Sequence, residues 1–160
     1  MSKLGFDGAT LDLMRSMYSG DVLYLQVNGE LCAALYLTQG LKQGCNLSPI
    51  LFNIMMIDLA KRYVSSGEGG RLGKHKLPAI LFADDLGLVA TSEAGIRRLI
   101  EITREEGSKF NMKISTKKSK IMILSPRNTP VIFTQPMELE IVNFYKYLGR
   151  GVYYVGFLNS

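Results

Sequence analysis

Apolar residues recur at helical spacing in three segments of the chain, each beginning at a residue that can cap a helix. Asp7 precedes the first segment, and Ser92 precedes the third. Ser48 is predicted to cap the second, with Pro49 as its first helical residue. The positions predicted to face a core are Leu11, Met14 and Tyr18; then Ile50, Leu51, Phe52, Ile54, Met55, Met56, Ile57 and Leu59; then Ile96, Leu99, Ile100, Thr103 and Phe110. Because the second segment is apolar almost all round, we expect a buried helix there.

Two hairpins are predicted between these helices. Residues 22–37 alternate between apolar and polar side chains around Asn28-Gly29, a pair typical of two-residue turns. Residues 79–91 are apolar on both sides of Asp84-Asp85, which places the two acids at or beside a second hairpin turn. Helices and antiparallel hairpins in mixed order predict one α+β domain, with a helical layer against one sheet.

The remaining segments are assigned by the same patterns. Residues 65–76 are polar and glycine-rich, which indicates a connection. Residues 113–124 and 131–154 are predicted to form further strands, the last pair turning near Gly149 to Gly151.

The composition agrees with one globular domain. Of the 160 residues, 47% are apolar and 21% are charged, enough to bury a sizeable core. No apolar stretch reaches the length of a membrane span and residues 1–18 lack a signal-peptide pattern, so we expect an intracellular protein without a membrane partner. Cys32 and Cys45 form no CxxC pair and His75 is the only histidine, which indicates neither a disulfide framework nor a zinc site.

Basic residues outnumber acidic ones, nineteen against fourteen, for a net charge of +5. This excess suits a polyanionic partner without requiring one. It lies in two clusters: Lys113, Lys117, Lys118, Lys120 and Arg127 in one, and Arg71, Lys74 and Lys76 in the other. On charge alone, each cluster is more simply a solvated face or loop. Gly73-Lys74 does not belong to a P-loop, because Glu68 and His75 occupy positions that need Gly and Ser or Thr.

Asp84 and Asp85 carry the clearest candidate chemistry. An ordinary turn explains one Asp, but two adjacent carboxylates repel each other unless a cation binds them. Mg²⁺ takes one or two carboxylates together with waters and substrate phosphates, which indicates a metal site at a sheet edge. A receiver domain is excluded because no Asp follows Asp85, and a glycosidase pair is disfavoured because neighbouring strand residues point to opposite faces. Metal-assisted phosphoryl transfer remains.

Four motifs in order resemble the reverse transcriptase domain of LINE-type, non-LTR retrotransposons. They are GLKQGCNLSPILFN at 40–53, FADD at 82–85, NMKISTKKSK at 111–120 and FYKYLG at 144–149. The resemblance spans essentially the whole chain. It implies a palm-like antiparallel sheet packed against helices, and an RNA-directed DNA polymerase that uses an RNA template, a DNA primer and deoxynucleoside triphosphates.

The resemblance also implies roles for individual residues. Asp84 and Asp85 would bind Mg²⁺, which Mn²⁺ can replace, in a two-metal nucleotidyl transfer. Lys118 would position or protonate the leaving group, although a solvated lysine explains it equally well. The positions implied in nucleotide and template binding are Gly40, Lys42, Gln43, Gly44 and Ser48, and those implied in a primer grip are Tyr147, Leu148 and Gly149. The last three are equally explained as plain strand and turn residues.

The sequence departs from the family pattern in three respects. Asp7, Asp12 and Asp21 do not stand in the context of the family's upstream metal-binding Asp, so one catalytic carboxylate is missing. Ser115 stands where the family often has Asn, and the fingers and thumb are absent. We therefore expect a polymerase fragment, inactive alone. The alternative is a non-enzymatic remnant that at most binds nucleic acid. The oligomeric state stays open.

Overall fold

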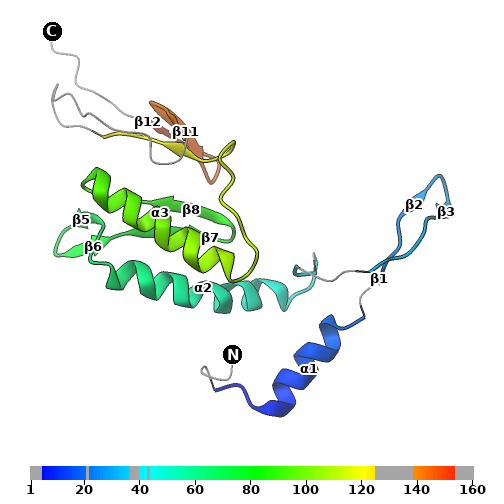
Figure 1. The fold of residues 1–160 in the computed structure, drawn as a ribbon. Helices are drawn as coiled ribbons and strands as arrows, with labels where there is room; N and C mark the ends of the chain where they lie inside the picture. Colours follow the sequence, from blue (N-terminus) through cyan, green and yellow to red (C-terminus); the bar gives the residue numbers. More distant parts are fainter. Residues whose placement is uncertain (1–4, 21, 37–39, 43, 125–138, 154–160) are drawn as a thin grey trace, which may run out of the picture. The chain divides into compact units, whose positions relative to one another are not determined.

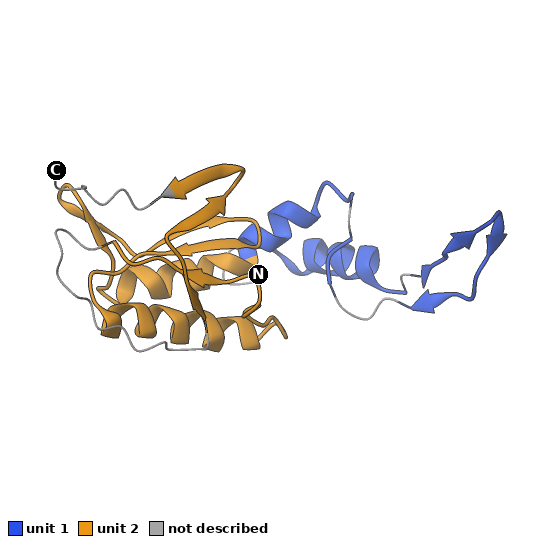
Figure 2. Cartoon of the chain, turned by 90° about the horizontal axis from the view of Figure 1, so that it is seen from above, with its two compact units in different colours: residues 1–54 blue, residues 55–160 orange. Residues whose placement is uncertain are grey.

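A computed structural model describes residues 5–20, 22–36, 40–42, 44–124 and 139–153 (Figure 1). The predicted site residue Gln43, the basic residue Arg127 and most of the predicted strand before residue 139 lie outside these ranges. The chain falls into two compact units, residues 1–54 and 55–160 (Figure 2). None of the helices in the described ranges is long and apolar enough to cross a membrane.

The first unit begins with helix α1 (Gly8–Tyr18), which starts where its cap predicts. The Asp7 carboxylate accepts a hydrogen bond from the Thr10 amide at 2.7 Å. The positions predicted to pack, Leu11, Met14 and Tyr18, are half-buried. No residue of α1 is fully buried, so its packing face is only partly covered.

A hairpin follows α1, as predicted. Strand β1 (Val22–Leu23) pairs with β4 (Leu35–Tyr36), and β2 (Gln26–Val27) pairs with β3 (Glu30–Leu31). Asn28 (φ 53°) and Gly29 (φ 88°) both have positive φ, the conformation that an Asn-Gly turn adopts between twisted strands.

Helix α2 (Ser48–Ser65) differs from its prediction at its start and in its burial. Ser48 is the first helical residue and not the cap. Its hydroxyl donates to the Lys42 carbonyl at 2.8 Å. Leu51, Leu59 and Tyr63 are buried, whereas Ile50 is 56% exposed. The expectation of a helix buried all round is therefore wrong: one face packs and another meets solvent.

Two consecutive antiparallel hairpins open the sheet region of the second unit. Strand β5 (Gly70–Leu72) pairs with β6 (His75–Leu77), and β7 (Ala79–Phe82) pairs with β8 (Asp85–Leu88). The prediction that residues 65–76 form only a connection is wrong, because Gly73-Lys74 is the turn of a short hairpin. The Val89 amide bonds the Pro78 carbonyl at 2.8 Å, which extends the β7–β8 pairing by one residue to the proline that links β6 to β7.

Helix α3 (Glu93–Ser108) packs along strand β8. The Ser92 hydroxyl accepts from the Gly95 amide at 3.0 Å, as the predicted cap requires. The predicted face is correct at Leu99 and Ile100, but Phe110 lies beyond the helix and is 43% exposed. The core comprises Leu59, Tyr63, Leu99 and Ile102, against which Leu86 and Leu88 pack, and a second cluster of Ile100, Ile121 and Leu139.

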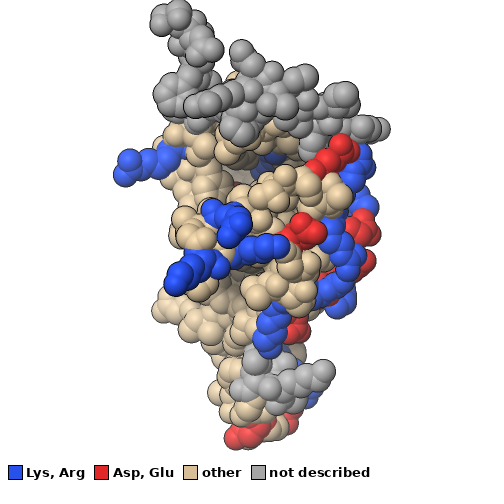
Figure 3. Space-filling model, turned by 90° about the vertical axis from the view of Figure 1, so that its left-hand side faces the viewer, with Lys and Arg blue, Asp and Glu red and all other residues tan. Residues whose placement is uncertain are grey.

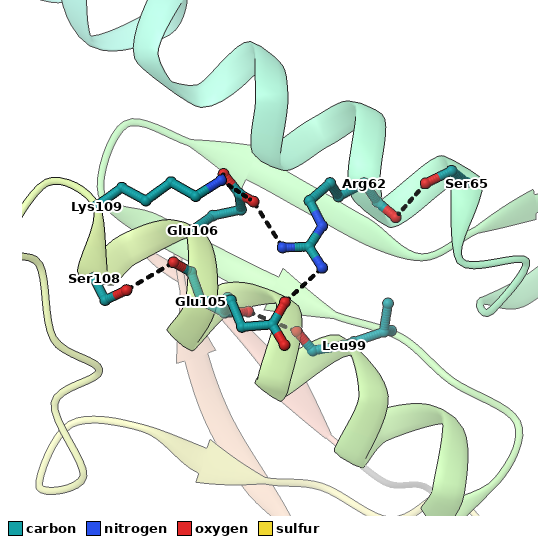
Figure 4. Close-up of polar contacts among 8 residues, drawn as sticks. Arg62, Ser65, Leu99, Glu105, Glu106, Ser108 and Lys109 are labelled. Atoms are coloured by element: carbon teal, nitrogen blue, oxygen red, sulfur yellow. Dashed lines mark hydrogen bonds and ion pairs between the residues drawn. The ribbon is translucent and has the colours of Figure 1, made fainter.

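An ion-pair network fastens α3 to α2 (Figure 4). The buried Glu106 carboxylate receives Arg62 at 2.7 Å and Lys109 at 2.7 Å, and Arg62 also contacts Glu105. Hydrogen bonds from Lys109, and then from Arg62, hold the pKa of Glu106 below its ordinary value. A carboxylate paired in this way keeps its charge inside the interface.

The last strands are shorter than predicted. Of residues 113–124 only β9 (Lys120–Ile121) is a strand, and it pairs in parallel with β10 (Glu140–Ile141), which departs from the expected antiparallel sheet. Strands β11 (Phe144–Tyr147) and β12 (Arg150–Tyr153) form an antiparallel hairpin. Its turn is Leu148 (φ 48°) and Gly149 (φ 78°), close to the predicted position. Helices and mainly antiparallel pairs agree with a mixed chain of helices and strands. The expectation of one sheet is wrong, because the described strands form six separate two-stranded sheets.

Candidate active site

The two acids lie at the tip of the β7–β8 hairpin, as the sequence predicts. Phe82 pairs with Asp85, so Ala83 and Asp84 are the two turn residues and Asp85 is the first residue of β8. Ala83 adopts φ 49°, which allows the chain to reverse within two residues. Both carboxylates are exposed, so they meet solvent and escape the cost of burying unpaired charge.

The apolar strand before the acids is less buried than expected. Ile80 is 44% exposed and Phe82 is 61% exposed, whereas Leu86 and Leu88 on β8 pack against the core. On β7 only Ala79 packs against that core, so the strand before the acids is less covered than the strand after them.

Tyr147 lies against this hairpin. Its hydroxyl is 3.5 Å from the Ile80 carbonyl oxygen, a long contact, and a Cβ placed on Gly87 would lie 3.8 Å from the end of its ring. Burial, and secondarily the negative charge of Asp85, raises the pKa of Tyr147. Tyr147, more than fifty residues after the acids in the sequence, thus contacts the Ile80–Gly87 pair of the hairpin whose tip carries them.

Lys118 lies in a turn and not in a strand. Its amide bonds the Ser115 carbonyl at 3.2 Å, and its side chain is exposed. The Tyr145 hydroxyl donates to the Lys118 carbonyl at 3.2 Å. Because Tyr145 and Tyr147 are two residues apart on β11, they point to the same side, toward the lysine turn and the acidic hairpin respectively.

Two glycines shape the predicted nucleotide loop. Gly40 (φ 103°) and Gly44 (φ 82°) adopt a conformation that favours glycine, and a Cβ at either position would meet open space. The glycines are therefore needed for the path of the chain and leave the backbone approachable.

Lys42 and Ser48 are engaged within this loop region. The Lys42 ammonium donates to the Met17 carbonyl at 2.5 Å and lies 5.4 Å from the centre of the Tyr18 ring. The hydroxyls of Tyr18 and Ser48 are 2.9 Å apart. The backbone amide of Leu47, and then the Tyr18 hydroxyl, lowers the pKa of Cys45 in the same loop.

Three residues that make these contacts are not among the site residues predicted from sequence: Tyr18, which was expected only to pack, Gly87 and Tyr145. Gly87 had a detectable signal, because a glycine inside a strand often marks the close approach of another group. Tyr145 could have been found from its two-residue spacing to Tyr147. Tyr18 had no signal, since its partners are 24 to 30 residues away.

The carboxylates fit one hard cation as a partial ligand set. Asp84 and Asp85 supply exposed oxygen ligands, the type that Mg²⁺ prefers. In the ranges that the structure describes, no group of three or more His, Cys, Asp or Glu side chains is arranged to hold a metal. Mg²⁺ commonly completes such a partial set with waters and substrate phosphates.

A tyrosine-backed acidic hairpin, a glycine loop before a helix and a lysine turn agree with a polymerase of the reverse transcriptase class. The family model for reverse transcriptase (RNA-dependent DNA polymerase) matches residues 3–152, and the chain belongs to this family. Its relatives include retrovirus-related Pol polyproteins of the retrotransposable element R2, which confirms the resemblance to LINE-type elements.

Three such relatives illustrate the extent of the similarity. The type-1 R2 polyprotein of Popillia japonica is 26% identical over 162 residues, covering 94% of this chain and 23% of the relative. The type-2 R2DM polyprotein of Drosophila melanogaster is 29% identical over 150 residues, covering 87% of this chain and 14% of the relative. A type-1 R2 polyprotein of Nasonia vitripennis is 41% identical over 59 residues, covering 37% of this chain and 6% of the relative. The chain spans less than a quarter of the length of these relatives.

Proposed function

We propose that this chain is the catalytic palm segment of an R2-like reverse transcriptase, which copies an RNA template by adding deoxynucleotides to a DNA primer. The observation that carries the proposal is the β7–β8 hairpin, with Asp84 in its turn, Asp85 leading β8 and Tyr147 against its side. This arrangement supports a site where two exposed carboxylates approach a reacting phosphate, with the ring of Tyr147 against the same hairpin.

Asp84 and Asp85 are the proposed ligands of Mg²⁺, with Mn²⁺ as a substitute. Bound there, the metal would supply positive charge for a primer hydroxyl and for the leaving pyrophosphate. Asp84, at the tip, is the more accessible ligand in this proposal, and Asp85 supports it from the strand.

The other site residues bind and orient the substrates. The backbone at Gly40 and Gly44 is open to a nucleotide, and Gln43 is proposed to hydrogen-bond there. Lys42 and Ser48 hold the loop through the bonds to Met17 and Lys42 described above. Lys118, exposed in its turn, is proposed to meet the leaving phosphates. Tyr147, Leu148 and Gly149 are proposed to form a surface for the primer end.

Metal binding tests the ligand assignment. Mn²⁺ titration of the 160-residue chain, followed by calorimetry or water relaxation, should show binding that is lost in the double variant Asp84→Asn, Asp85→Asn. The matched control is Asp58→Asn, which removes an exposed carboxylate of α2 that is paired with Lys61 at 3.9 Å. Equal signals from the parent and the double variant would contradict the assignment.

Primer extension tests the reaction. Residues 3–152 would replace the matching segment of the Drosophila R2DM polyprotein, and extension on an RNA template is expected from this chimera. Asp84→Asn should abolish it, and Asp58→Asn should leave it unchanged. A chimera that folds and binds primer–template but never extends it would contradict a catalytic role and favour a remnant that only binds nucleic acid.

A further inference from the structure

The hairpin formed by β5 and β6, residues 70–77 and named here the basic hairpin, concentrates positive charge on a short exposed projection. Arg71, Lys74, His75 and Lys76 are all exposed. Arg71 and Lys76 are directly opposite each other in the register, so two like charges share one face. Such a pair destabilises a hairpin unless an anion lies near it.

No acidic side chain in the described ranges neutralises this charge. Neither Arg71 nor Lys74 makes an ion pair there, and the Lys76 ammonium donates to the neutral Gly67 carbonyl at 2.5 Å. Glu68, the nearest acid in the sequence, lies against Gly95 in the first turn of α3, since a Cβ on Gly95 would be 2.4 Å from its carboxylate. Figure 3 views the molecule from the side on which β5 and β6 lie in Figure 1. Several Lys and Arg side chains gather at the centre and left of this view, and most Asp and Glu side chains lie to the right.

The opposite face of the basic hairpin exposes one aliphatic side chain and one imidazole. Leu72 is 67% exposed and pairs across the turn with His75. An exposed aliphatic group beside an imidazole can take an unstacked base, as aromatic and apolar platforms do in proteins that bind single strands. Paired bases in a duplex present no such face, so the hairpin favours a single strand.

The basic hairpin is remote from the acidic turn. Gly70, at its base, lies against Val89, which follows the end of β8, while Asp84 and Asp85 lie at the other end of the β7–β8 hairpin (Figure 1). Four residues of β8 and three of β5 separate the tips, so at about 3.3 Å per residue they are roughly 20 Å apart. A nucleoside triphosphate at Asp84 cannot reach Lys74, whereas a polynucleotide can.

We propose that the basic hairpin binds single-stranded RNA at a subsite separate from Asp84 and Asp85, with Arg71, Lys74 and Lys76 on phosphates and Leu72 and His75 against a base. This inference rests on the proposed function for the choice of RNA among polyanions. In this proposal, these residues bind the RNA strand at a distance from the end where nucleotides are added.

The test is fluorescence anisotropy of the 160-residue chain with a labelled single-stranded RNA of mixed sequence, at several salt concentrations. The triple variant Arg71→Gln, Lys74→Gln, Lys76→Gln should lower the slope of log affinity against log salt by about 2, at about 0.7 per phosphate, and weaken binding roughly tenfold to hundredfold at about 0.1 M salt. The matched control is Arg97→Gln, Arg98→Gln, Arg104→Gln on α3, which removes the same charge and should change affinity less than threefold. Far-UV circular dichroism checks that both variants fold.

A second variant separates stacking from charge. Leu72→Ser with His75→Ser should weaken RNA binding about tenfold while leaving the salt slope unchanged, because no phosphate contact is removed. If folding of the triple variant fails, Lys74→Gln alone, at the turn, should still lower the slope by about 0.7.

The outcomes distinguish this inference from the proposed function. RNA binding that is absent, or equally weakened by the α3 control, overturns the inference, and so does tighter binding of duplex DNA, anionic vesicles or DNA single strands than of RNA. Mn²⁺ binding that depends on Asp84 should survive in the triple variant. If Mn²⁺ binding survives but RNA binding does not depend on the basic hairpin, only this inference is wrong. If RNA binding depends on the basic hairpin but no metal binds, only the proposed metal ligands are wrong.

Discussion

The hydroxyl of Tyr145 donates to the main-chain carbonyl of Lys118 at 3.2 Å. Two residues along the same strand, Tyr147 contacts the β7–β8 hairpin at Ile80. Since both side chains lie on one side of β11, this strand connects the lysine turn with the acidic hairpin. The geometry of the candidate site therefore depends on a strand that carries neither its acids nor its lysine.

Replacing Tyr145 by Phe should loosen the lysine turn while keeping the ring. The loss of one partly exposed hydrogen bond should lower the free energy of unfolding by about 0.5–1 kcal/mol. The amide of Ser119, bonded to the Ser115 carbonyl at 2.9 Å, should exchange faster with deuterium. Tyr24→Phe is the control, because Tyr24 is 58% exposed and should change neither quantity. Unaltered Ser119 protection in Tyr145→Phe would show that the bond does not hold the turn.

Glu106→Gln should destabilise the packing of α3 on α2. The variant leaves Arg62 and Lys109 facing a neutral amide in a buried place, so the free energy of unfolding should fall by about 2 kcal/mol in a urea titration. Glu101→Gln is the matched control, since its ion pair with Arg104 is exposed on the same helix and should be worth less than about 0.5 kcal/mol. Similar losses in the two variants would contradict the buried network.

The same carboxylate predicts acid sensitivity. The pKa of Glu106 is held below its ordinary value, first by Lys109 and then by Arg62, so folding favours the charged form. Its contribution is present above the unfolded pKa, about 4.3, and disappears as the pH falls through the lower folded pKa. Urea midpoints measured from neutral pH downward should therefore fall less steeply in Glu106→Gln than in the parent. Parallel profiles would contradict the lowered pKa.

Tyr63 predicts the opposite behaviour at alkaline pH. Burial raises its pKa to about 12, against the opposing effect of its hydrogen bond with Thr103. A raised pKa favours the neutral phenol in the folded chain, so this contribution is full below the unfolded value, near 10, and is lost as the pH rises toward about 12. Tyr63→Phe should flatten the alkaline decline in stability. Absorbance near the tyrosinate band should show one phenol fewer ionising late.

Local signals explain what the sequence predicted correctly. The caps at Asp7 and Ser92 and the turns at Asn28 and Asp84 each depend on residues within three positions, where side-chain chemistry decides the backbone. The position of Asp84 and Asp85 at a hairpin tip could therefore be read from the chain alone, although their part in metal binding stays a prediction.

Longer-range contacts explain the features that the sequence did not predict. Ser48 has the composition of a cap, but its hydroxyl is taken by the Lys42 carbonyl and by Tyr18, a residue 30 positions away. Glu106 follows a run of charged residues that favours solvent, yet Arg62, 44 positions away, draws it into an interface. The contact of Tyr147 with Ile80 spans 67 positions, and its one local signal is the glycine opposite Ile80, which does not identify its partner.

Gly69 offers the sharpest test of how the basic hairpin is seated. It adopts φ 134°, and a Cβ there would lie 2.8 Å from the backbone of both Leu77 and Pro78, so Gly69→Ala combines backbone strain with a clash that no side chain can relieve. We expect a loss of roughly 2–4 kcal/mol in the free energy of unfolding.

Gly73→Ala is the matched control. Its φ of 61° is also positive, but a Cβ there meets nothing within 4 Å, so only the conformational cost of about 1 kcal/mol should remain. Because the chain has no Trp, far-UV circular dichroism in urea is the suitable measurement. Equal losses in the two variants would show that the close approach of Leu77 and Pro78 does not constrain the hairpin, whereas the predicted difference would mean that the base of the basic hairpin requires a glycine at position 69.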